Sequence, residues 1–241
     1  MEERSEKIEV IPEGPSGEDL QEYITWVLTQ DASKNPLNDF TGERSSRNQG
    51  RSDVWFIPGT TTHKGTITRT CDVPSNREIV ILAATSDSSY LEHGDAKNDA
   101  QLLEIAMKVA KLHKDILIKI ADDKGGWVRF EVADASNQEG ESKLIKRNAF
   151  PIIIPESNIY RQLYSVRGGY THLAVVAFGI KVKLKPGKYE LIMQAHHDGT
   201  SEPLEVDSVK VDAPPFNLDI KYDLNAREEK EVSLASSKYS E

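Results

Sequence analysis

The sequence predicts a mainly β protein: a single antiparallel β-sandwich of jelly-roll or immunoglobulin-like type, with two accessory α-helices. Short runs of β-branched and aromatic residues recur along the chain, and turn residues such as Pro186-Gly187 separate them. Only two segments, near 17–30 and 99–113, have the apolar spacing of a helix. About ten strands and two helices, joined mainly by turns, favour a sandwich.

The first helix follows a lead-in segment. Residues 1–15 are charged and then rich in Pro and Gly, so we expect a flexible segment or an edge strand. Ser16 and Asp19 have the spacing of a capping box, which predicts the start of a helix over 17–30. The domain is therefore expected to begin at residue 16.

Two strands around residue 60 are the centre of the prediction. Val54–Ile57 is short and apolar, and Pro58-Gly59 closes it, as is typical of a buried strand. Residues 66–73 alternate strictly, which places Arg69 on the apolar side of a half-buried strand. A guanidinium in that position must pair with oxygen atoms or bind an anion, so Arg69 is either structural or ligand-binding.

The rest of the chain is predicted to contain the helix over 99–113, a polar loop over 86–95 and a further series of strands. These strands are expected at 79–84, 116–120, 127–132, 150–154, 173–184, 189–193, 204–206, 209–211 and 216–224. A change of parity between 204–206 and 209–211 predicts a β-bulge. Residues 16–224 then form one domain, and residues 225–241 form a polar C-terminal tail.

One block of the sequence resembles a known family. Its residues are Asn35-Pro36-Leu37, Asp39, Thr41-Gly42, Gln49, Val54 to Thr60 and Arg69 to Pro74. This block is similar to a family of uncharacterised bacterial and archaeal proteins with Asn-Pro-Leu, Thr-Gly, Val-Trp-Phe-Leu-Ala-Gly-Thr and Arg-Xaa-Cys-Xaa-Val-Pro. No activity is established for that family, so the resemblance implies no catalytic residue.

The resemblance continues weakly from about Tyr23 to Leu224. Relatives often carry a second cysteine shortly after Thr-Gly and look exported. This chain has Arg44-Ser45-Ser46 at that place, so an extracellular disulfide does not carry over.

Charge and cysteine content limit the function classes. The 241 residues carry a formal net charge of −9, which argues against a nucleic-acid groove and against an anionic membrane surface. Cys71 is the only cysteine, and a charged N-terminus without an apolar stretch gives no sign of a signal peptide. A cytoplasmic location is favoured, and an exported form whose signal has been removed stays open.

Two groups of residues are candidate sites. Trp55, Arg69 and Asp87 lie near strand ends and long loops that are expected to converge into a ligand site. His196, His197 and Asp198, or the acidic residues of 87–95, are the candidate metal ligands. Adjacent histidines on a strand point to opposite faces, so they chelate one ion only if the strand has already ended.

Three functions follow from these observations. A non-catalytic binding or assembly module, with a protein or carbohydrate ligand, is favoured because such a site needs no motif. An enzyme with a site around Trp55, Arg69 and Asp87 is the first alternative. A metal-binding protein using His196 and His197 or the 87–95 loop is the second. No cofactor is predicted apart from a divalent cation in that last case, and the oligomeric state stays open.

Overall fold

The computed structural model describes residues 2–49, 53–60 and 65–228, and it is mainly β, as predicted. The six-stranded sheet has the order β1 (Glu2–Arg4), β7 (Trp127–Asp134), β6 (Lys114–Asp122), β10 (Gly187–His197), β13 (Phe216–Arg227), β4 (Ile67–Pro74). The five-stranded sheet consists of β2 (Ile8–Val10), β9 (Gly169–Leu184), β5 (Glu78–Ser89), β3 (Val54–Ile57) and β8 (Ile145–Ile154), which pairs with β9. A separate hairpin joins β11 (Leu204–Val206) to β12 (Val209–Val211).

Both predicted helices are present. They are α1 (Gly17–Leu28) and α2 (Asp99–Ala110). Ser16 and Asp19 form the expected capping box, and the Asn98 side chain caps α2. The described chain also contains two short helices and three 3₁₀ turns that were not predicted: α3 (Gln138–Ser142), α4 (Ile159–Tyr164), η1 (Ala32–Lys34), η2 (Pro36–Asn38) and η3 (Glu43–Ser46).

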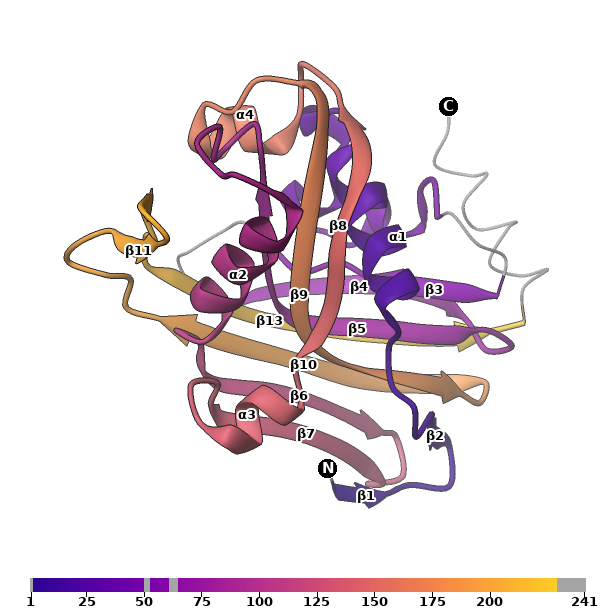
Figure 1. The fold of residues 1–241 in the computed structure, drawn as a ribbon. Coiled ribbons are helices and arrows are strands. Elements are labelled where there is room, and N and C mark those ends of the chain that lie inside the picture. Colours follow the sequence, from indigo (N-terminus) through magenta and orange to yellow (C-terminus); the bar gives the residue numbers. More distant parts are fainter. Residues whose placement is uncertain (1, 50–52, 61–64, 229–241) are drawn as a thin grey trace.

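The two large sheets share one hydrophobic core. Leu191 and Ile220 of the six-stranded sheet belong to the same buried cluster as Ile81 and Ile180 of the five-stranded sheet. The other face of the five-stranded sheet forms a second core with α1 and α4. Figure 1 shows β8 and β9 rising together above the six-stranded sheet, with α1 on one side and α2 on the other. The five-stranded sheet is therefore buried on both faces, which explains its continuous apolar runs.

The prediction of a purely antiparallel fold is wrong. β4 runs parallel to β13, and β3 runs parallel to β5. Parallel neighbours need a crossover connection. Here the chain crosses over through β4, which follows β3 and precedes β5 in the sequence but belongs to the six-stranded sheet. Residue alternation reports which face is buried but not the direction of the neighbouring strand, so the sequence pattern did not reveal this.

Several boundaries differ from the prediction. The expected loop over 86–95 is wrong in its first part, because β5 continues to Ser89 and its polar residues are covered by helices. The expected bulge between β11 and β12 is a tight hairpin turn, in which Asp207 and Ser208 have φ values of 43° and 79°. β1 and β2 lie within the predicted lead-in, and β13 extends to Arg227, into the predicted tail. Residues 229–241 of that tail lie outside the described residues.

No helix among residues 2–49, 53–60 and 65–228 is long and apolar enough to cross a lipid bilayer.

Residues 29–49, which follow α1, have a defined structure built from side-chain hydrogen bonds. The Asn35 amide donates to the carbonyl of Val27 at 2.8 Å, and the Asp39 carboxylate accepts from the backbone N–H groups of Thr41 and Arg44. The Gln49 side chain accepts from the Phe56 N–H at 2.9 Å and donates to the Phe56 carbonyl at 3.0 Å. Gln49 thus takes the place of a neighbouring strand beside β3.

We expect Gly42→Ala to destabilise the protein by about 2 kcal/mol or more, because it combines backbone strain with a steric clash. Gly42 has φ +98°, and a Cβ there would lie 2.2 Å from the Thr70 carbonyl oxygen. Gly125→Ala is the matched control, because Gly125 has φ +84° and open space around the added Cβ. Urea unfolding measures both variants, and an equal loss of stability in the two would contradict the packing role of Gly42.

Candidate functional site

The three residues of the predicted ligand site do not meet in the structure. Trp55 points into the inter-sheet core, where it is 6 % exposed and lies 5.9 Å from the Arg77 guanidinium. Asp87 pairs in register with Val175 and therefore faces the second core, on the opposite side of the five-stranded sheet. Arg69 lies in the other sheet. A pocket that combines these three side chains is therefore not formed.

Arg69 is a buried structural residue, 1 % exposed. Its Nη1 donates to the Gly59 carbonyl at 2.8 Å and to the Tyr222 hydroxyl at 2.6 Å, and its Nη2 donates to the Leu37 carbonyl at 3.3 Å. The Tyr222 hydroxyl in turn donates a hydrogen bond to the Pro58 carbonyl at 2.7 Å. The guanidinium thus stabilises the turn after β3 and the loop at Leu37, and it is not available to a ligand.

The candidate metal residues at the end of β10 point in different directions. His197 is buried against Phe216 and His113, with ring centroids 5.9 and 4.9 Å away. His196 lies on the other face of the strand, with Nδ1 3.6 Å from an Asp115 carboxylate oxygen, and Asp198 is exposed. The two rings therefore do not converge on one ion position. Among the described residues, no group of three or more His, Cys, Asp or Glu side chains is placed to hold a metal.

The segment 87–95 brings two carboxyl groups together. Asp87 Oδ1 accepts a short hydrogen bond from the Tyr160 hydroxyl of α4, and Glu92 Oε2 accepts from the Ser89 hydroxyl at 2.8 Å. Burial raises the pKa of both carboxyl groups, and the charge of Asp87 further raises that of Glu92. This acid pair lies beneath α4 rather than in an open site.

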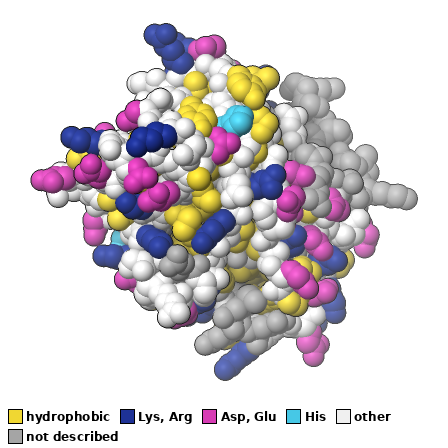
Figure 2. Space-filling view, viewed as in Figure 1, with side chains coloured by type: hydrophobic (Ala, Val, Ile, Leu, Met, Phe, Trp, Pro, Cys, Tyr) yellow, Lys and Arg dark blue, Asp and Glu magenta, His cyan; other side chains and the backbone are white. Residues whose placement is uncertain are grey.

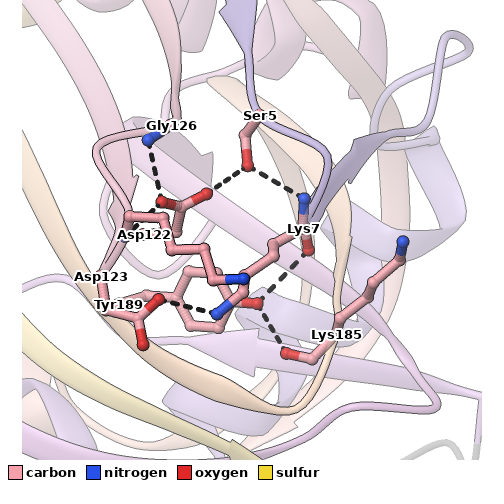
Figure 3. A network of polar contacts seen from close by, with 8 residues as sticks. Ser5, Lys7, Asp122, Asp123, Gly126, Lys185 and Tyr189 are labelled. Carbon is pink, nitrogen blue, oxygen red and sulfur yellow. Dashed lines mark hydrogen bonds and ion pairs between the residues drawn. The ribbon is translucent and has the colours of Figure 1, made fainter.

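A shallow hollow of about 500 Å³ lies on the outer face of the six-stranded sheet. Three of its carboxylates already have partners within the protein: Ser5 donates to Asp122 at 2.6 Å, Lys7 contacts Asp123 at 2.7 Å, and Lys221 contacts Glu190 at 2.5 Å. Figure 3 shows the first two contacts holding the N-terminal segment against the turn after β6. These groups therefore stabilise the fold and do not form the candidate site.

The best candidate site is a surface formed by Tyr90, Asp99, Ile153, Tyr170 and His172, here called the Tyr170 surface. Ile153 and Tyr170 are direct cross-strand partners on β8 and β9, and they are 70 % and 67 % exposed. His172 lies two residues along the strand from Tyr170 and shares its face. Hydrophobic side chains gather beside a histidine over the upper ends of β8 and β9 (Figure 2).

Hydrogen bonds fix the polar side chains of the Tyr170 surface. Asp99 accepts from the Tyr90 hydroxyl at 2.8 Å and from His172 Nδ1 at 2.9 Å. A carboxylate only accepts, so Nδ1 carries the proton, and in the neutral ring Nε2 accepts from the Tyr170 hydroxyl at 3.4 Å. The hydrogen bonds from His172 and Tyr90 lower the pKa of Asp99, so it is ionised at neutral pH.

The Tyr170 surface has almost no signature in the sequence. Asp99 lies at the predicted start of the helix over 99–113, and His172 lies just before the predicted strand over 173–184. Their meeting depends on how α2 packs beside β9, which is a long-range contact. The one local signal was the alternation of Tyr170 and His172 at the start of a strand whose next ten residues, 173–182, are all buried.

Comparisons with protein-family models, with curated proteins and with solved structures find no match to this chain.

We expect Arg69→Met to lower the free energy of unfolding by about 3 kcal/mol, because two buried carbonyls and the Tyr222 hydroxyl lose a charged donor. Chemical denaturation measures the change. Arg129→Met, at an exposed ion pair with Glu131, is the control and should change stability by less than about 0.5 kcal/mol. A loss below about 1 kcal/mol for Arg69→Met would mean that the guanidinium is solvated.

Proposed function

We propose that this protein is a non-catalytic binding module that binds a saccharide at the Tyr170 surface. The observation that carries the proposal is the exposed Tyr170 ring, 67 % accessible, whose hydroxyl belongs to the hydrogen-bonded group of Tyr90, Asp99 and His172. The two sheets that share one core support a sandwich of mixed sheets as the scaffold.

The chemistry of the surface supports a saccharide. A sugar ring has an apolar C–H face and a rim of hydroxyls, so it needs a flat apolar contact beside fixed donors and acceptors. Tyr170 and Ile153 supply the apolar contact, and Asp99 and His172 supply polar groups that are 46 % and 35 % exposed at their side chains.

The hydrogen bonds at this surface contribute little to folding. Exposed ion pairs and hydrogen bonds stabilise a protein by only about 0–1 kcal/mol, because water competes with them and ordering the side chains costs entropy. Their physical effect is to hold Asp99 and His172 in one arrangement before a ligand arrives. Such preorganisation lowers the entropic cost of binding.

Strand pairing with a second copy is a less suitable use of this region. Among the described residues, β8 pairs with β9 alone, so no described strand lies along its other edge. That edge carries Pro151, Lys146 and Arg147, and the ladder is irregular between Arg147 and Phe150. Proline, cations and bulges at an edge strand are features that prevent edge-to-edge pairing. Contacts through the side chains of the outer face are therefore favoured over addition of a strand.

The test is a titration of the purified protein with soluble pentasaccharides of glucose, xylose, mannose and N-acetylglucosamine, followed by NMR chemical shifts. We expect at least one to bind, with shifts centred on residues 170–172, and Tyr170→Ala to weaken that binding by about tenfold, or ~1.4 kcal/mol.

Phe40→Ala is the matched control, because Phe40 is an aromatic residue that is 62 % exposed and lies outside the Tyr170 surface. It should leave binding unchanged. Absence of binding to every saccharide, or equal weakening by the two variants, would overturn the proposal. Self-association that Tyr170→Ala abolishes, without saccharide binding, would assign the surface to protein contact instead.

A further inference from the structure

Two carboxyl groups lie together beneath α4 at the end of β5. Asp87 and Ser89 lie on the same face of β5, the face that packs against the second core. The Ser89 hydroxyl donates a hydrogen bond of 2.8 Å to the Glu92 carboxylate. The Tyr160 hydroxyl of α4 donates to Asp87 Oδ1, so the acid pair forms part of the contact between α4 and β5.

The surroundings of the acid pair offer little compensation for negative charge. Asp87 Oδ2 is buried and has no hydrogen-bond partner in the described structure. The groups that act on the two carboxyls are the Tyr160 hydroxyl, the Ser89 hydroxyl and backbone N–H, and the carboxyls themselves. Two ionised carboxylates would therefore repel one another in a site of low polarity.

Within the part of the chain that the structure describes, no cation of a neighbouring element acts on the acid pair. From α4, Tyr160 and Tyr164 face the pair, and their phenol pKa values are both raised by burial and by the two carboxylates. Arg161 of α4 is exposed and pairs with Glu156. From β9, the register partners of Asp87 and Ser89 are Val175 and Leu173, which are apolar. His93, beside Glu92, is influenced by burial and by Asp95 rather than by the pair.

We propose that Asp87 and Glu92 share a proton that holds α4 against β5, and that losing this proton loosens α4. The device is a pH-sensitive latch. In the closed state one carboxyl group is neutral, and the Tyr160 hydrogen bond joins the helix to the strand. In the open state water solvates both carboxylates and screens the repulsion between their charges.

The direction of the pH effect follows from proton linkage. Burial raises the pKa of Asp87 to about 6, and burial with the charge of Asp87 raises that of Glu92 to about 8. Once α4 is open, both groups titrate near their ordinary values of about 4. Between about pH 4 and pH 8 the closed state therefore binds more protons than the open state. Opening becomes easier as the pH rises from about 4 to about 8, and it changes little above that.

Hydrogen exchange of the full chain tests the latch at pH 5 and pH 8.5, after correction for the intrinsic exchange rate. We expect the protection of the amides of residues 159–164 to fall at least tenfold at the higher pH. A difference of one pKa unit between the closed and open states changes their equilibrium tenfold. Glu92→Gln removes one of the two titrating groups, whereas burial still raises the pKa of Asp87, so the fall in protection should be at least threefold smaller than in the wild-type protein.

Glu131→Gln is the control, because Glu131 is an exposed partner of Arg129 and should keep the wild-type response. If Glu92→Gln does not fold, Asp87→Asn removes the other member of the pair and should reduce the response in the same way. Equal protection of α4 at both pH values in the wild-type protein would overturn the latch. So would a wild-type response in a folded Glu92→Gln or Asp87→Asn protein.

The latch and the saccharide site consist of different residues. α4 leads into β9, on which Tyr170 lies, so opening of the helix would change the approach to the Tyr170 surface. The exchange experiment contains no saccharide, and its outcome therefore decides the latch alone.

Discussion

The buried Arg69 guanidinium is the interaction on which the arrangement of the two sheets depends. It belongs to β4 of the six-stranded sheet, and its acceptors are the Gly59 carbonyl after β3 and the Leu37 carbonyl of η2. Tyr222 of β13 supports it from the neighbouring strand. A buried cation is costly unless oxygen atoms surround it, so these loops must adopt one conformation for the fold to form. The same contacts hold the crossover between the sheets: the chain leaves β3, forms β4 in the six-stranded sheet, and returns as β5 beside β3.

This constraint gives a physical reason for the most distinctive part of the sequence. Asn35 and Asp39 cap loop backbone, Gly42 allows close approach to Thr70, and Gln49 pairs with the edge of β3. Each of these residues, and Arg69 as well, holds the chain in place instead of facing a ligand. These residues thus form a structural unit in this protein. The candidate site lies elsewhere, at the upper ends of β8 and β9 (Figure 1).

The elements with strong local signals could be predicted from the sequence, and the long-range contacts could not. The capping box at Ser16 and the alternation around Arg69 each depend on residues close in the chain, so the helix and the strand were found. The parallel pairing of β4 with β13 depends on where the chain crosses between sheets. Asp87 was expected in a loop because polar residues followed an apolar run, whereas α4 covers it within β5. Asp99 and His172 meet only because α2 packs beside β9.

The candidate site follows from the same architecture. β9 is long enough to contribute its second half to the inter-sheet core and its first residues to a surface outside it. Arg69 joins the two sheets, because its guanidinium links β4 of one sheet to the turn after β3 of the other. NMR of the Arg69 side chain tests this most directly. The account predicts separate, slowly exchanging Nη–H signals, because rotation of the guanidinium is blocked by its bonds to Gly59, Leu37 and Tyr222. A single averaged signal that exchanges with water as fast as that of an exposed arginine would contradict it.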